Sequence, residues 1–230
     1  MQYRQRDWRP ALTYIALATV ALLSMSFAIR ATGLGWAGLT TDLTGVSRLF
    51  AADGWLSNPA IFGHMIPGAV ITLLAPLQLV APLRKRYPRV HRWTGYVFFV
   101  CALASAIGGT TYILVHGTIG GPLMDVGFAA YGICVIAAAV QTVRHARARR
   151  FDRHREWALR LFFLAIGSWI YRAQYSVWYF FTGGLWTAPG FSGPFDQFQI
   201  FAFYVPYLIG LEVYFRLRRG AVPAGQVAAG

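Results

Sequence analysis

The sequence predicts an all-α, polytopic membrane protein with six transmembrane helices. Apolar residues make up 57% of the 230 residues and charged residues only 13%, a balance that does not suit a compact water-facing domain. The apolar residues fall in runs of about twenty, the length that crosses a hydrocarbon core about 30 Å thick. Basic residues gather at the ends of these runs, so charge and hydropathy indicate the same helix boundaries.

The placement of the net charge of +13 predicts the orientation of the chain. Of the 21 Lys and Arg residues, 17 fall in four clusters: Arg4–Arg9, Arg84–Arg92, Arg144–Arg155 and Arg216–Arg219. Each cluster borders an apolar run, and alternate loops are nearly free of basic residues. Because basic loops stay on the cytoplasmic side, we expect both termini in the cytoplasm. The topology then explains the net positive charge without a nucleic-acid partner. Anionic lipid headgroups at the cytoplasmic face are the expected contact of the basic residues.

The six apolar runs predict six helices in chain order. The first, about 11–30, is expected to be a retained helix rather than a cleaved signal peptide, with Pro10 in its first turn. The others cover about 62–83, 92–115, 123–144, 155–181 and 198–217. Residues 1–220 are thus expected to form one transmembrane domain, with the second to fifth helices as a four-helix core over about 62–181. Residues 221–230 carry no charge and predict a disordered tail.

Polar side chains inside the hydrocarbon layer are costly, so each is a candidate for function. A rise of about 1.5 Å per residue sorts them by depth, and the inner layer holds His91, His154, Arg160, Gln78 and Glu212. Arg160 lies about 9 Å deeper than His154, and Glu212 lies about 6 Å from the inner end of the last helix. Their matched depth and opposite charges predict an ion pair. The alternative is that Glu212 handles protons or binds a substrate.

The outer layer holds His64, His116, Arg172, Gln174 and Asp125. Arg172 lies about 27 Å from His154 along an ideal helix, which places it near the outer interface. There its long side chain either reaches the headgroups or binds an anionic group, such as a haem propionate, a quinone oxygen or a lipid phosphate.

The stretch from His64 to Arg172 resembles a bacterial predicted-membrane-protein family known as domain of unknown function 2306. The residues that carry the resemblance are His64, Gly68, Leu77-Gln78, the turn Arg86–Gly95, Gly120-Gly121, Gly127-Phe128, His154–Trp157 and Arg160. The resemblance implies a multi-pass helical protein of the bacterial inner membrane, with these histidines and arginines as its characteristic polar positions. It implies no established activity.

The histidines give the most concrete functional hypothesis, which is b-type haem binding with electron transfer, linked to a quinone or another redox partner. Such a haem needs two neutral imidazoles at one depth. His91 with His154 meet that condition at the inner face, and His64 with His116 roughly meet it at the outer face. Arg160 and Arg172 would then offset the propionate charges. The spacing of twenty-five residues between His91 and His116 is longer than diheme bundles use, which weighs against the hypothesis.

Four alternatives stay open at this point. The histidines and arginines of the basic turns can simply fix the hairpins and face the headgroups, or they can form a metal or proton-transfer site. Arg160, Glu212 and Gln78 can line a path for an ion or a small molecule in a transporter. The protein can also be a non-catalytic scaffold or assembly factor, in which the same residues only hold helices together. The oligomeric state is not predicted.

Overall fold

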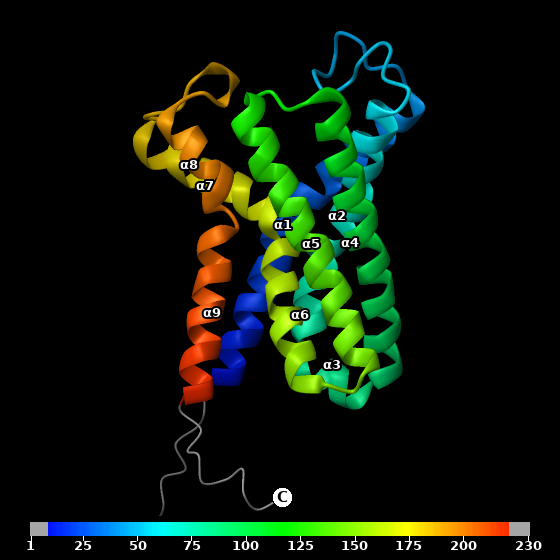
Figure 1. Cartoon of the computed structure of the whole chain (residues 1–230), viewed down its shortest axis with the longest axis vertical. Helices are drawn as coiled ribbons and strands as arrows, with labels where there is room; N and C mark the ends of the chain where they lie inside the picture. Colours follow the sequence, from blue (N-terminus) through cyan, green and yellow to red (C-terminus); the bar gives the residue numbers. More distant parts are fainter. Residues whose placement is uncertain (1–8, 221–230) are drawn as a thin grey trace, which may run out of the picture. The chain divides into compact units, whose positions relative to one another are not determined.

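The computed structural model describes residues 9–220, whose regular structure is α-helix apart from one short 3-10 turn (Figure 1). The chain divides into two compact units, residues 1–115 and 116–230. The predicted four-helix core over 62–181 spans the boundary between these units and stays a prediction. The predicted tail, 221–230, and the first two arginines of the N-terminal cluster lie outside the described residues.

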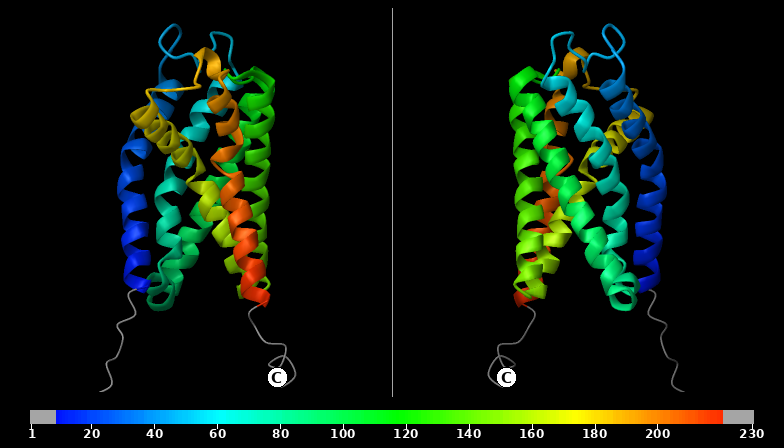
Figure 2. Two further views of the ribbon diagram at one scale, coloured as in Figure 1. Left: turned by 90° about the vertical axis from the view of Figure 1, so that its left-hand side faces the viewer. Right: turned by 90° about the vertical axis from the view of Figure 1, so that its right-hand side faces the viewer.

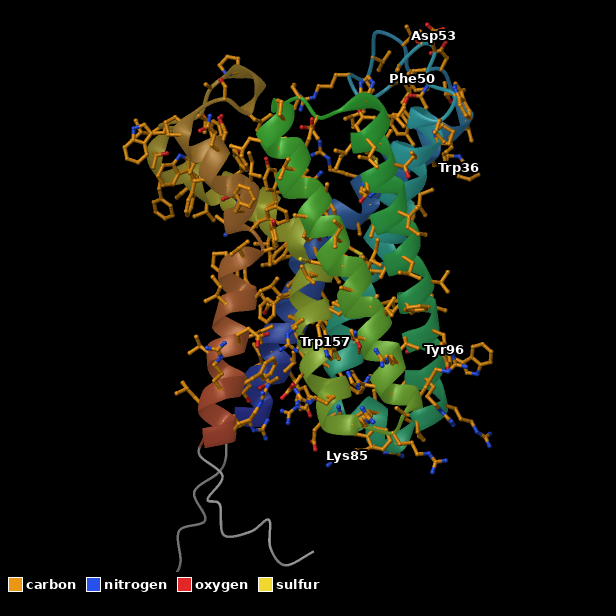
Figure 3. The ribbon with its side chains drawn as sticks, viewed as in Figure 1. Trp36, Phe50, Asp53, Lys85, Tyr96 and Trp157 are labelled. Atoms are coloured by element: carbon orange, nitrogen blue, oxygen red, sulfur yellow. The ribbon has the colours of Figure 1, made fainter. Side chains whose placement is uncertain are left out.

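The first unit contains three long helices and a short one. They are α1 (Arg9–Thr40), α2 (Ser57–Leu79), α3 (Ala81–Arg86) and α4 (Pro88–His116). Helices α1 and α4 run in one direction and α2 runs in the other, with α1 packed along α2 (Figure 2). The short α3 carries Arg84, Lys85 and Arg86. Lys85 lies at one end of the unit, whereas Trp36, Phe50 and Asp53 lie at the other (Figure 3), as the charge pattern predicts.

Helix α1 is longer than the sequence predicted, because it continues past residue 30 to Thr40. Its added turns contain Gly35 and Gly38, which face Phe62 of α2. A Cβ on Gly35 would lie 2.8 Å from the Phe62 carbonyl oxygen, and a Cβ on Gly38 would overlap the Phe62 ring. The missing side chains let the two helices approach closely, which is how small residues promote helix association in lipid. Phe62 is fully buried at this contact.

The loop between α1 and α2 is ordered by short-range polar contacts. The Asn58 side chain accepts a hydrogen bond from the Ala51 amide at 2.9 Å and donates one to the Ala51 carbonyl at 2.8 Å. At the start of the loop, Asp42 accepts a hydrogen bond from the Thr44 amide at 2.8 Å. Hydrogen bonding to Thr44 lowers the pKa of Asp42 below its ordinary value. The loop therefore holds a fixed shape at the end of the unit.

The second unit begins with a helical hairpin and continues with three further α-helices and a 3-10 turn among the described residues. Its elements are α5 (Gly121–Arg147), α6 (Phe151–Ala165), α7 (Gly167–Thr182), a 3-10 turn (Pro189–Phe191), α8 (Pro194–Ala202) and α9 (Val205–Gly220). Helices α5 and α6 lie side by side and antiparallel (Figure 1). The tight turn between them is basic, and Arg149 adopts a left-handed conformation there (φ 55°).

Five segments of the described chain are long and apolar enough to cross a membrane: α1 from Ala11, α2, α4, α5 and the stretch Pro194–Gly220 that joins α8 to α9. The chain is therefore a polytopic membrane protein, as the sequence predicted. The predicted fifth crossing, 155–181, is not one continuous helix in the structure. It is divided into α6 and α7 at Ile166, and Figure 1 shows the change of direction there.

The α1–α2 contact gives a first test. We expect Gly38→Ala to lower the thermal stability of the full-length protein in detergent, because overpacking against Phe62 costs about 1–3 kcal/mol. Gly33→Ala is the matched control, since a Cβ on Gly33 meets nothing within 4 Å. Equal melting temperatures for the two variants would contradict the close contact.

Candidate functional site

The interruption between α6 and α7 is stabilised by a side chain from α5. The Tyr131 hydroxyl donates a hydrogen bond to the carbonyl of Leu164, immediately before the break at Ile166. A Cβ on Gly167 would lie 3.0 Å from the Tyr131 hydroxyl oxygen, so glycine leaves room for this approach. Because lipid offers no hydrogen bonds, helix breaks at membrane depth need such internal partners.

A second irregularity lies between α8 and α9, at Phe203 and Tyr204. Pro206 has no N–H, so the carbonyl of Ala202 has no intrahelical partner four residues ahead. The side-chain amide of Gln174, on α7, donates to that carbonyl at 3.5 Å. The Tyr204 hydroxyl donates to the carbonyl of Gly127 on α5 at 3.2 Å. Side chains of neighbouring helices therefore support both irregular segments.

Aromatic rings fill the space between the two irregular segments. The Tyr131 ring centroid lies 4.9 Å from that of Phe203 and 5.4 Å from that of Tyr204. Phe203 also packs edge-to-face against Phe128 at 5.6 Å and Tyr171 at 5.3 Å. Edge-to-face contacts of this kind stabilise an aromatic cluster beyond its buried area, so the segment between α8 and α9 is packed against α5 and α7.

An open groove lies beside this cluster, between α7 and the α8–α9 segment, with a volume of about 470 Å³. Its floor carries a carboxamide pair, in which the Gln199 side chain donates to the Gln174 side-chain oxygen at 2.6 Å. Gln199 is only 1% exposed. The lining is otherwise mostly aromatic or aliphatic and includes Trp169, Val177, Trp178, Phe195, Phe198 and Tyr207. The groove is thus an apolar site with a small number of placed polar groups, the usual composition of a ligand pocket.

Asp196 closes the outer end of the same segment. Its carboxylate is 1% exposed and accepts hydrogen bonds from the Tyr175 hydroxyl at 2.7 Å, the Ala188 amide at 2.9 Å and the Gly193 amide at 3.0 Å. Three donors satisfy a buried carboxylate. Asp196 therefore ties the loop after α7 to α7 itself.

The predicted outer cation, Arg172, binds to its own helix. Its Nη1 donates to both the carbonyl and the hydroxyl oxygen of Ser168, each at 2.8 Å. The other outer residue of this unit, Asp125, accepts a hydrogen bond from the Thr118 amide at 2.7 Å. Asp125 thus closes the loop that precedes α5.

His154 lies in the first turns of α6 and contacts the end of α5. Its Nδ1 is 2.9 Å from the carbonyl oxygen of Thr142. Since a carbonyl can only accept, Nδ1 carries a proton, and in the neutral form of the ring the lone pair is then on Nε2. The same hydrogen bond orients histidines that ligate metals, and here it also joins the two helices of the hairpin.

His64 forms the equivalent contact in the first unit. Its Nδ1 lies 3.1 Å from the Ser105 carbonyl oxygen and 3.3 Å from the Ser105 hydroxyl. Gly108 and Gly109 of α4 give the ring its space, because a Cβ on Gly108 would lie 2.9 Å from the His64 Cβ. His64 therefore joins α2 to α4.

The other predicted histidines lie at the ends of α4. His91 is half-buried in the first turn, where Gln78 of α2 donates to the Thr94 hydroxyl at 2.7 Å and Thr94 contacts the His91 carbonyl at 3.3 Å. His116 is the exposed last residue of α4. Each of the two predicted haem pairs has one member in each unit, so both pairings stay predictions. Within residues 9–220, no three His, Cys, Asp or Glu side chains could together hold a metal ion.

The predicted pairing of Arg160 with Glu212 is confirmed. The Arg160 Nε and Nη2 atoms lie 2.7 Å and 2.5 Å from one Glu212 carboxylate oxygen. The guanidinium group lies between the rings of Trp157, at 4.6 Å, and Phe215, at 4.8 Å. Its remaining Nη1 is buried and has no hydrogen-bond partner among the described residues. Arg160 is therefore enclosed by α6 and α9.

A second ion pair, absent from the sequence prediction, joins the same two helices. Glu156, one turn before Arg160, lies 3.1 Å from Arg219 of α9 and 3.2 Å from Arg153 of its own helix. The spacing of four residues between Glu156 and Arg160 could have indicated it. No comparable signal marked Tyr131, Gln199 or Asp196, because their partners are backbone groups or lie on distant segments.

Comparison with known proteins gives one match. Residues 61–189 match the family described as predicted membrane protein DUF2306. No curated protein and no solved structure matches the chain.

The Tyr131 contact predicts a specific stability effect. Tyr131→Phe should destabilise the protein by about 1–3 kcal/mol, because the Leu164 carbonyl loses its donor while staying buried. Gly167→Ala should do the same by displacing the hydroxyl, and the double variant should lose less than the sum. Thermal unfolding in detergent measures this, with the exposed Tyr96→Phe as control. Strict additivity would rule out a shared cause.

The Arg160–Glu212 pair predicts a different pattern. Glu212→Leu alone should cost about 2–3 kcal/mol, because a buried guanidinium group is left without its partner. The double change Arg160→Met with Glu212→Leu should be milder. Arg218→Met, on an exposed part of α9, is the control. If the double variant melts as low as the single one, the pair does not serve to hold the helices together.

Proposed function

Since the chain belongs to the DUF2306 family of predicted membrane proteins, we propose that it is a bacterial inner-membrane protein that binds b-type haem. It exchanges electrons with a quinone of the membrane. The observation that carries the proposal is the hydrogen bond from Nδ1 of His154 to the Thr142 carbonyl, at 2.9 Å, with its counterpart at His64. These contacts hold both rings in the tautomer whose Nε2 can ligate iron.

The proposed topology has six crossings with cytoplasmic termini. In it, α6 and α7 together form the fifth crossing, since Phe151–Thr182 is long enough to span the hydrocarbon core when taken as one segment. The basic residues of α3 and of the α5–α6 turn then lie on the cytoplasmic side, where anionic lipids are the expected contact.

The residues present fit individual ligand roles. His154 is the best-oriented ligand, and His91 is the partner that the sequence names for it. When bound, haem would supply one-electron redox chemistry. The predicted role of the two arginines as partners of the propionates is withdrawn, because Arg160 already binds Glu212 and Arg172 already binds Ser168. Both arginines are thereby assigned to the helix framework rather than to propionate groups.

A scaffold function is the second candidate, and the two ion pairs between α6 and α9 favour it. One pair neutralises Arg160 with Glu212 and the other neutralises Glu156 with Arg219, so these residues form fixed contacts between the two helices. A transporter would instead need these residues to contact a moving solute, and flux in proteoliposomes would then depend on Arg160. A scaffold predicts neither flux nor a coloured protein.

The haem proposal has a direct spectroscopic test. Full-length protein expressed with sufficient haem should show a Soret band, and His154→Ala should lose most of it because one axial ligand is gone. His145→Ala is the matched control, as His145 lies in the same basic turn region and is not assigned as a ligand. A colourless wild-type protein, or equal bands in both variants, would disprove the assignment.

A further inference from the structure

We propose that the groove between α7 and the α8–α9 segment binds the ring of a neutral membrane quinone. This assignment rests on the proposed quinone-linked function for its physiological role. The groove itself is formed wholly by the second unit, from residues 169–207. Sequence patterns did not indicate it, because its walls come from three separate helices.

The first step concerns charge. Among the described residues, no Asp, Glu, Lys, Arg or His lines the groove. A phosphate or carboxylate ligand would need a cation or several amide donors at short range. The lining therefore selects an uncharged ligand and rejects a phospholipid headgroup.

The second step concerns shape. The Trp178 ring stacks on Phe195, with centroids 4.4 Å apart and planes only 6° from parallel. The indole N–H of Trp178 donates to the Leu185 carbonyl at 2.6 Å, which fixes the ring in place. Such a rigid aromatic wall favours a flat ring over a mobile acyl chain, because little conformational freedom is lost when the ring binds.

The third step concerns hydrogen bonds. The Tyr207 hydroxyl accepts from the Gln174 amide at 3.4 Å, and among the described residues its own proton has no acceptor. The Gln174 amide makes only long contacts, to Tyr207 and to the Ala202 carbonyl at 3.5 Å. The Tyr207 hydroxyl can therefore donate to a carbonyl oxygen of the ligand, which a quinone presents and a hydrocarbon chain does not.

The fourth step concerns access. Phe198 and Val177, at the rim, are 66% and 57% exposed, and both are apolar. In a membrane protein such an open apolar rim suits a ligand that arrives through the bilayer. An isoprenoid tail would then remain among the lipids while the ring enters the groove.

Tryptophan quenching by decylubiquinone in the purified full-length protein tests the proposal. Wild type should bind saturably. Tyr207→Phe should weaken binding by about three- to tenfold, the loss expected for one hydrogen bond. Tyr214→Phe, two turns further along α9, is the matched control and should bind as wild type does. Val177→Phe, which adds bulk at the rim, should also weaken binding, so the proposal does not depend on a single variant.

Two results would overturn the assignment. Unsaturable quenching that is equal in all four proteins would mean that the quinone only partitions into the detergent. A tightly held phospholipid, found by mass spectrometry and not displaced by decylubiquinone, would assign the groove to an acyl chain. Haem is measured separately by its Soret band, so quinone binding by a colourless protein would support the groove and reject the haem.

Discussion

The structure depends on the requirement that every backbone polar group inside a membrane finds a partner within the protein. An uninterrupted helix meets this requirement by itself, as the long apolar helices α1, α4 and α5 do. The second unit departs from it at Ile166 and before Pro206, where carbonyl groups lose their helical partners. Tyr131 and Gln174 supply the missing donors. Each departure is therefore possible only because a neighbouring helix presents a polar side chain at the right level.

This requirement also explains how the polar residues are distributed. His64 and His154 are each bonded to a carbonyl of an adjacent helix, and Arg160 is bonded to Glu212. Such contacts offset the cost of placing polar atoms in lipid. The Tyr207 hydroxyl differs, because among the described residues its proton has no acceptor. A group of that kind can still bind a ligand.

The sequence predicted much of the fold, because hydropathy and charge are local signals. Runs of apolar residues located the crossings, and the depth match between Arg160 and Glu212 located their ion pair. The division of the expected fifth crossing at Ile166 could not be predicted in this way. Gly167 alone does not break a helix, and the hydrogen bond beside the break comes from Tyr131, more than thirty residues away. The groove could not be predicted either, because its lining residues come from separate helices. Gln174 was identified as polar, but its partners, Gln199 and Ala202, become neighbours only when α7 and α8 pack together.

The two ion pairs between α6 and α9 have a further consequence. Glu156 and Arg160 face Arg219 and Glu212, so the signs alternate along both helices. If α9 slid by one turn, about 6 Å, Arg216 would replace Glu212 opposite Arg160 and two like charges would meet. Lipid-facing helices of similar hydropathy have few other means of distinguishing one register from the next. The two ion pairs thus favour a single register of α9 against α6.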